Sequence, residues 1–303
     1  MSQGEKIEIP SVDLLDRQRD VVNKLWDVSR ATRVEPGWHY LLDLTWIVEN
    51  LGPVDGKQIL DAGAGMGLMQ WFLIEQGAAE VISADRGSRY DLPLVMRSRY
   101  KVLGLRPDDL GPAWNVLKGN VSRASGIGKL VYFLRGLVAL AMIALPRRFS
   151  GTVLIYNQDL TSMPEVPDNS LDTVVAVSAL EHNTPEELQK VVAEIMRKLK
   201  PGGKLLATLC AGKDKDWFHE PSHGWCYTDS TLRKLFDLSA DVPSNYDRHD
   251  ELLYSLRNNA ELRDKLARIY FQSGDNGMPW GKWNPQYQPV GVCKVKPIGP
   301  ESS

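Results

Sequence analysis

Residues 58–67 read Gln58-Ile59-Leu60-Asp61-Ala62-Gly63-Ala64-Gly65-Met66-Gly67, and this stretch decides the fold. It predicts a short apolar strand, a glycine-rich turn and the start of a helix. Glycine has no Cβ and adopts positive φ, so such a turn brings backbone N–H groups close to a ligand. The following helix points its positive end and its unpaired N–H groups at the same place. Asp61 adds a negative charge, so the turn suits a ligand that carries both an amine and a carboxylate.

The glycine spacing separates this turn only in part from a dinucleotide-binding fingerprint. In the G-x-G-x-x-G pattern the third glycine comes one residue later than Gly67 does here. Asp61 stands where it would repel a nucleotide phosphate, and it has a clear use against an ammonium group. A second acid, Asp85, ends the next apolar run at about the distance at which folds of this kind bind ribose hydroxyls. These two features alone leave an NAD-binding protein open.

Three further apolar runs predict the rest of a parallel sheet, and one helix lies between the last two. Apolar residues recur at helical spacing from Pro185 to Leu199, and Thr184 suits the N-cap of that helix. The runs and the residues that follow them are Val153 to Asn157 with Asp159 and Leu160, Leu171 to Val177 with Ser178 to His182, and Lys204 to Leu209.

With these elements in order, the chain resembles the class I S-adenosylmethionine-dependent methyltransferases that act on small molecules, with a type 11-like domain. The resemblance covers roughly Trp38 to Asp237 apart from one insertion. It implies an α/β fold, Rossmann-like and doubly wound, with a seven-stranded and mostly parallel sheet. It also implies S-adenosylmethionine as cofactor. The motifs that carry it are Asp61 to Gly67, Asp85, Asp159-Leu160, Ser178 to His182, and Leu199 to Gly203 before an apolar strand.

The resemblance implies a role for each of these residues. The methionine end of the cofactor is held by Asp61, Gly63, Ala64, Gly65 and Gly67. The ribose hydroxyls bind Asp85, and Arg86 beside it contacts the cofactor. The adenine amino group donates to Asp159, with the Leu160 backbone N–H nearby. Ser178 lines the gap between cofactor and acceptor.

A length of 303 residues allows one large domain or two small ones, and the content of 43% apolar residues is ordinary for a globular protein. We predict a single domain over residues 1–303. The three cysteines are far apart and odd in number, so no disulfide framework is implied. The polar first ten residues lack the apolar core of a signal peptide. We therefore expect a cytoplasmic location.

An insertion separates the second and third predicted strands. One helix around Leu92 to Leu103 would connect them, which leaves residues 104–151 in excess. From Arg86 to Ser150 there are 12 Lys or Arg against 3 acidic residues, a net charge of +9. Within residues 130–145 only Arg135 is polar. A helix apolar on almost every side is either buried or in lipid.

The insertion has two main interpretations, and an oligomer interface is a third. The insertion is either a buried cap packed over the active site or a segment that contacts an anionic membrane surface through residues 123–148. The second interpretation would place the protein peripherally on the inner membrane surface. The basic residues that flank the apolar run are Arg123, Lys129, Arg147 and Arg148.

Three histidines are the candidate catalytic residues. His182 is the first, because it follows the fourth strand near the transferable methyl group. His219 and His223 lie in a loop at the carboxyl edge of the sheet. They match a zinc-protease pattern, but Pro221 and Gly224 disfavour the helix that such a site needs. We therefore predict no metal.

The two ends of the chain complete the prediction. Helices are expected in residues 1–55, where Trp38 or Tyr40 would lie over the cofactor. Residues 238–303 should form helices, an aromatic loop with Trp280, Trp283 and Tyr287, and a last antiparallel strand over Val290 to Val295.

The predicted function is methyl transfer from S-adenosylmethionine to a small-molecule or lipid- or glycan-linked acceptor. The rim rich in histidines and acids favours a hydroxyl oxygen. Carbon or nitrogen acceptors, an NAD-dependent oxidoreductase and a catalytically silent binding protein stay open. A nucleic-acid partner is not expected, because Ser178 to Glu181 stands where such methyltransferases carry an Asn/Asp-Pro-Pro-aromatic motif. The sequence does not predict the oligomeric state.

Overall fold

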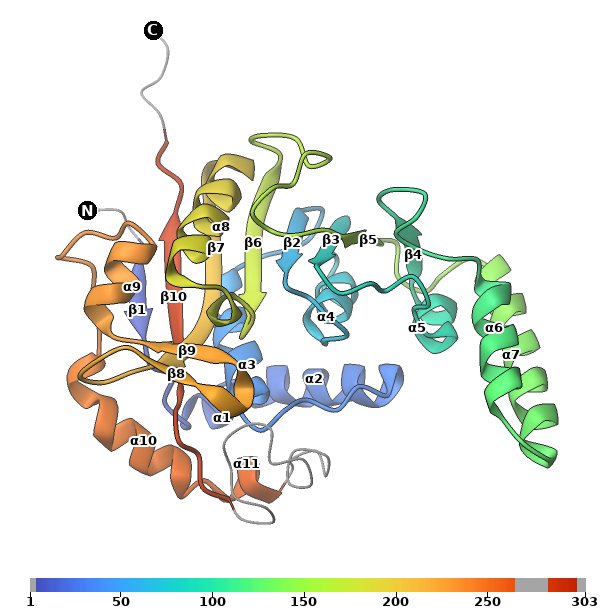
Figure 1. The fold of residues 1–303 in the computed structure, drawn as a ribbon, viewed down its shortest axis with the longest axis horizontal. Coiled ribbons are helices and arrows are strands. Elements are labelled where there is room, and N and C mark those ends of the chain that lie inside the picture. The colour runs from blue at the N-terminus through green and yellow to red at the C-terminus, as the bar shows by residue number, and fades with distance from the viewer. Residues whose placement is uncertain (1–3, 265–282, 299–303) are drawn as a thin grey trace, which may run out of the picture.

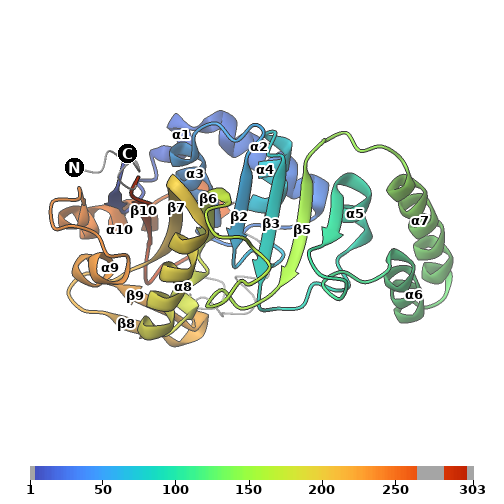
Figure 2. The same cartoon turned by 90° about the horizontal axis from the view of Figure 1, so that it is seen from above.

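The fold is known from a computed structural model, which describes residues 4–264 and 283–298. Figure 1 shows a central sheet with helices on both faces and a pair of helices that projects at the right. The view from above in Figure 2 separates the layers, with α1 to α4 on one face of the sheet and α8 and α9 on the other. This is the expected doubly wound α/β arrangement.

Within the described residues ten strands form the sheet, three more than the seven predicted. Eight of them follow the order β1-β10-β7-β6-β2-β3-β5-β4, and β9 pairs with the end of β7 while β8 pairs with β9. The run from β7 to β4 is parallel, and β10 is antiparallel to both β7 and β1. The bounds are β1 Lys6–Glu8, β2 Gln58–Ala62, β3 Glu80–Asp85, β4 Lys101–Gly104, β5 Thr152–Asn157, β6 Leu171–Val177, β7 Leu199–Ala211, β8 Trp217–His219, β9 Gly224–Tyr227 and β10 Pro289–Val295.

The helix that apolar periodicity predicts from Pro185 to Leu199 is confirmed as α8, which ends at Lys198. The helix α8 begins after Thr184, whose side chain accepts from the Glu187 backbone N–H while the Glu187 side chain accepts from the Thr184 N–H. Within residues 1–55, where helices are expected, α1 and α2 are separated only by Gln18. The bounds are α1 Leu14–Arg17, α2 Arg19–Thr32, α3 Tyr40–Leu51, α4 Met69–Glu75, α5 Leu94–Arg99, α6 Ala113–Arg123, α7 Ile127–Ala144, α8 Pro185–Lys198, α9 Asp229–Leu235, α10 His249–Arg257 and α11 Ala260–Asp264.

Both faces of the sheet are apolar, and each carries its own hydrophobic core. Successive side chains of a strand point to opposite faces. Ile59 of β2 therefore packs in the core that contains α2, α3 and α4, whereas Leu60 packs in the core that contains α8 and α9. Burial on both faces explains why the central strands are continuous apolar runs without alternation.

The insertion does not form the predicted cap. Residues 104–151 contain α6 and α7, which form a helical hairpin beyond the β4 edge of the sheet, and α7 packs on α5 and α6 (Figures 1 and 2). The predicted helix from Leu92 to Leu103 is also corrected, because it ends at Arg99 and β4 follows. The strand β4 pairs with β5, whose outer edge would otherwise present unpaired backbone groups.

Candidate active site

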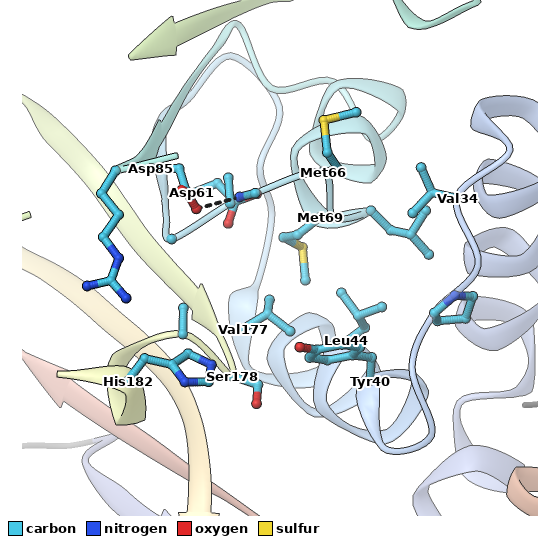
Figure 3. A pocket seen from close by; sticks show the side chains of 18 of the residues that line it. Val34, Tyr40, Leu44, Asp61, Met66, Met69, Asp85, Val177, Ser178 and His182 are labelled. Atoms are coloured by element: carbon cyan, nitrogen blue, oxygen red, sulfur yellow. Dashed lines mark hydrogen bonds between the residues drawn. The ribbon is translucent and has the colours of Figure 1, made fainter. Parts of the chain in front are cut away.

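A pocket of about 400 Å³ opens at the carboxyl ends of β2, β3, β5 and β6. Ligands bind at this edge in open α/β sheets, and the volume falls within the usual range for small-molecule sites. Figure 3 shows Asp61 and Asp85 on one side, Ser178 and His182 below them, and Tyr40 on the facing helix α3. All ten residues that the sequence assigned to the cofactor line this pocket: Asp61, Gly63, Ala64, Gly65, Gly67, Asp85, Arg86, Asp159, Leu160 and Ser178.

The turn between β2 and α4 requires glycine for two physical reasons. Gly63 and Gly65 have φ of +74° and +46°, in the left-handed region that side chains with a Cβ rarely adopt. A Cβ on Gly63 would also lie 2.3 Å from the Cβ of Ala179. The turn therefore packs directly against the loop that follows β6, and this contact fixes the distance between the two walls of the pocket.

Asp61 is a buried acid with an unsatisfied oxygen. Its side chain is 2% exposed, and Oδ2 has no hydrogen-bond partner. Burial raises the pKa of Asp61 to about 7, although the Arg89 guanidinium and the Gln70 backbone N–H oppose the shift. A cationic group that donates to Oδ2 would supply both the missing hydrogen bond and the missing charge.

Asp85 ties the end of β3 to the glycine turn. Its Oδ2 accepts from the Gly65 N–H at 2.8 Å, and its Oδ1 accepts from the Gly87 N–H at 2.6 Å. A carboxylate has about four acceptor sites, so two remain for hydroxyl donors. The carboxylate is thus oriented by the backbone before any ligand binds.

Asp159 is both a turn residue and part of the pocket wall. Its Oδ1 accepts from the Thr161 N–H at 2.8 Å and from the Thr161 hydroxyl at 2.6 Å. These two hydrogen bonds hold the pKa of Asp159 below its usual range. The nearby Arg86 charge contributes in the same direction. The side chain is therefore an oriented, ionised acceptor at the far end of the pocket from Ser178.

Ser178 has strained backbone at the end of β6. Its φ is +45°, and its hydroxyl donates to Glu181 Oε1. Glu181 is 1% exposed, its Oε2 has no partner, and burial raises its pKa. Glu181 belongs to the motif from Ser178 to His182, but no role was predicted for it. Its position three residues after Ser178 is the feature of the sequence that could have indicated this contact.

His182 also lines the pocket, at the end of a 3₁₀ turn over Leu180–His182. Its Nδ1 lies 3.0 Å from the backbone oxygen of His223. A carbonyl oxygen only accepts, so we assign the proton of the neutral ring to Nδ1 and the lone pair to Nε2. In this tautomer His182 can accept a proton through Nε2.

The structure does not bring His219 and His223 into the pocket. The loop after β7 folds back as the β8–β9 hairpin, so His219 is 2% exposed and bonds Ser222 Oγ at 2.6 Å through Nδ1. Burial lowers the pKa of His219. His223 reaches the site only through its carbonyl. The two histidines flank a 3₁₀ turn, so they do not lie on one face of an α-helix as the zinc-protease pattern requires.

The N-terminal segment forms the wall opposite the glycine turn. Tyr40 and Leu44 of α3 line the pocket together with Val34, so Tyr40 lies where one of the two predicted aromatic residues was expected. Trp38 does not, because it is fully buried against Trp283. The predicted aromatic Trp280 lies outside the described residues.

Comparison with known proteins agrees with this geometry. A sequence model of the methyltransferase domain family matches residues 137–207. The chain contains a class I S-adenosylmethionine-dependent methyltransferase domain. An uncharacterised methyltransferase of Geobacillus kaustophilus is 28% identical over 109 residues, which is 36% of this chain and 48% of that protein. The chain thus matches about half the length of that curated relative.

Two solved methyltransferase structures are similar to the methyltransferase domain and its flanking segments. One is phosphoethanolamine N-methyltransferase 2 of Haemonchus contortus, solved with S-adenosylhomocysteine, which is 16% identical with a TM-score of 0.49. The match covers 94% of this chain and 59% of that protein's chain. The other is the 1,6-didemethyltoxoflavin-N1-methyltransferase of Burkholderia thailandensis, which is 14% identical with a TM-score of 0.43. This match covers 92% of this chain and 86% of that protein's chain.

The pocket of this methyltransferase domain fits S-adenosylmethionine, which is the cofactor of such domains. The unpaired Oδ2 of Asp61 matches the amino group at the methionine end, whereas the N–H groups of Gly63, Ala64, Gly65 and Gly67 already donate to acceptors within the protein. Asp85 and Asp159 supply acceptors for the ribose hydroxyls and the adenine amino group. The pocket therefore offers carboxylate acceptors for the amino group, the ribose hydroxyls and the adenine amino group of the cofactor.

Proposed function

We propose that the chain transfers the methyl group of S-adenosylmethionine to a hydroxyl oxygen of a small-molecule or lipid- or glycan-linked acceptor. The observation that carries the proposal is Asp61. A buried acid with a free oxygen beside a glycine turn is costly for the protein alone, and a cationic amine in the pocket would remove that cost.

When bound, the cofactor supplies an electrophilic methyl group on a positively charged sulfur. The chain itself has to position the acceptor oxygen in line with that methyl group and remove its proton. His182 Nε2 would accept the proton of the acceptor hydroxyl as the acceptor oxygen takes the methyl group that the cofactor would supply, with the neutral thioether as the leaving group. His182 keeps the required tautomer because the His223 carbonyl holds its Nδ1 proton.

Ser178 and Glu181 help to position the acceptor. The Ser178 hydroxyl is directed by its bond to Glu181, so the lone pairs of the serine oxygen are left for a hydrogen bond from the acceptor. Glu181 is not among the residues that line the pocket, so it is not placed to take the proton of the acceptor. We assign it the role of a positioning residue.

The proposal is tested by incubating the protein with methyl-labelled S-adenosylmethionine and cell extract, and by following labelled products with mass spectrometry. Asp61→Asn serves as the matched inactive variant. Binding is measured separately by calorimetry with S-adenosylhomocysteine and with NAD. Tight binding of NAD and none of S-adenosylhomocysteine would instead support an oxidoreductase.

We also propose that the protein works in a reducing, cytoplasmic compartment. Cys210 and Cys226 are neighbours across the β7–β9 pair, and both are free thiols. In an oxidising compartment two such neighbours would be exposed to disulfide formation. Thiol titration of the unreduced protein in denaturant should count three thiols, and a count of one would contradict this location.

A further inference from the structure

The helical hairpin formed by α6 and α7 exposes an unusual amount of apolar surface. Among the residues that the structure describes, 17 large hydrophobic side chains are exposed, and 11 of them lie between Trp114 and Leu145. In α7 itself only Gly136 is buried. Contiguous apolar surface of this kind marks an interaction site.

One face of α7 holds the helix in place. The Gly136 backbone approaches α6 so closely that a Cβ there would lie 2.1 Å from Leu117 Cδ1. Ala139, Leu140 and Ile143 follow on the same face and pack in a small cluster with residues of α5 and α6. The hairpin is therefore anchored to the domain through this face of α7 and through α6, which also contacts α5.

The opposite face of α7 is an uninterrupted apolar stripe. Its residues recur three or four positions apart, the spacing of one side of a helix. All are exposed, and the helix that carries them is long and apolar enough for a membrane by length and composition. We define the stripe as Ile127, Leu130, Leu134, Val138, Ala141 and Leu145.

The charge of the hairpin is uniformly positive. Residues 111–150 contain no acidic residue. Arg147 caps the last turn of α7 by donating to the carbonyls of Met142, Ile143 and Leu145, so its charge stays at the end of the stripe. The basic residues of the segment are Lys118, Arg123, Lys129, Arg135, Arg147 and Arg148.

We propose that this hairpin docks the protein on an anionic lipid bilayer, with α7 lying in the plane of the surface and its stripe in the acyl-chain boundary. An amphipathic surface with basic residues around an apolar face has this preference. A second copy of the chain fits the surface less well, because pairing two hairpins would bring their positive charges together without any carboxylate in either segment to offset them.

Helix length argues for an in-plane orientation and against a membrane-spanning hairpin. The 18 residues of α7 measure about 27 Å, but the 11 residues of α6 measure only about 16 Å against a hydrocarbon core of about 30 Å. A hairpin with one such short arm cannot cross the bilayer and return.

Sedimentation of the full chain with vesicles tests the inference independently of methyl transfer. We expect binding to vesicles of phosphatidylcholine with about one third phosphatidylglycerol, weakening as salt shortens the Debye length from about 10 Å at 0.1 M to about 3 Å at 1 M. Leu134→Glu with Val138→Glu should lower the partition coefficient by roughly a hundredfold. Tyr254→Glu, an equally exposed apolar site on α10, should leave it unchanged.

Two results would overturn the inference. One is that the wild-type chain stays in the supernatant with anionic vesicles at low salt. The other comes from sedimentation velocity without lipid, where a dimer that the Leu134→Glu, Val138→Glu variant converts to monomer, with vesicle binding unchanged, would assign the stripe to a second copy. Since the stripe is exposed, circular dichroism should show the variant folded as the wild type.

Discussion

The replacement of Asp61 by asparagine should weaken cofactor binding and stabilise the ligand-free protein at the same time. Burial moves the pKa of this acid from 3.8 to about 7, a shift of about three units. At 1.36 kcal/mol per unit, ionising the buried group costs about 4 kcal/mol. Asparagine has nearly the same shape and cannot ionise.

The sign of the pH effect follows from the raised pKa. Between about pH 4 and pH 7 the folded chain keeps the Asp61 proton that the unfolded chain has lost, so the free energy of unfolding falls as the pH rises through this window. Asp61→Asn removes that loss. We expect the variant to match the wild type near pH 4 and to exceed it by up to about 4 kcal/mol at pH 8 in urea unfolding.

Binding should change in the opposite direction. Without the charge-assisted hydrogen bond, the binding free energy for S-adenosylhomocysteine should weaken by about 2–3 kcal/mol at pH 8. This corresponds to a roughly hundredfold rise of the dissociation constant. Below pH 7 the wild-type constant should also rise, by up to tenfold per pH unit, while that of Asp61→Asn stays flat. Calorimetry between pH 5.5 and pH 8.5 measures both curves.

Asp172→Asn is the matched control, with the opposite expected effect on stability. Asp172 accepts from the Gln58 N–H at 2.9 Å and from Lys200 at 2.7 Å, and the Lys200 and Gln58 bonds hold its pKa below the usual range despite partial burial. This variant should lose stability at neutral pH and bind normally. Unchanged S-adenosylhomocysteine affinity in Asp61→Asn, or a lower stability than the wild type at pH 8, would refute the reasoning.

Three further substitutions test the turn, the base and the hairpin. Gly63→Ala should cost about 3 kcal/mol of stability and abolish cofactor binding, and the added Ala179→Gly should recover part of the stability because it removes the 2.3 Å contact. His182→Ala should lower kcat by about a hundredfold or more, whereas His223→Ala, which keeps the contacting carbonyl, should change kcat by less than about twofold. Gly136→Val should separate α7 from α6, seen as faster proteolysis within residues 111–150 while the melting temperature of the rest changes little.

The parts of the fold that follow from short-range patterns could be predicted from the sequence. The strand β2, its glycine turn and the capping box of α8 depend on residues within a few positions of one another. The acids at the strand ends were also placed correctly, because parallel strands bring their carboxyl ends to one edge.

The parts that were missed depend on long-range pairing. The strand β4 forms because it pairs with the open edge of β5, about fifty residues later in the chain. Its own four residues resemble the end of a helix. The β8–β9 hairpin folds back on β7 and thereby buries His219, which no local pattern shows. The apolar run of α7 has the composition of a buried helix, so only its packing reveals that it is exposed.

The edge formed by β1 and β10 has a consequence for how the chain folds. The last strand in the chain, β10, lies between the first strand and β7, and β1 pairs with no other strand. Until residues 289–295 have been synthesised, β1 has only its bridge from Ile7 to Ser244 among the described residues, and β7 presents an open apolar edge. The sheet can therefore be completed only late in translation, through a contact between Lys6 and Cys293 that spans almost the whole chain. Delayed closure of this kind exposes a nascent chain to strand-mediated aggregation, and folding helpers would act most effectively in that interval.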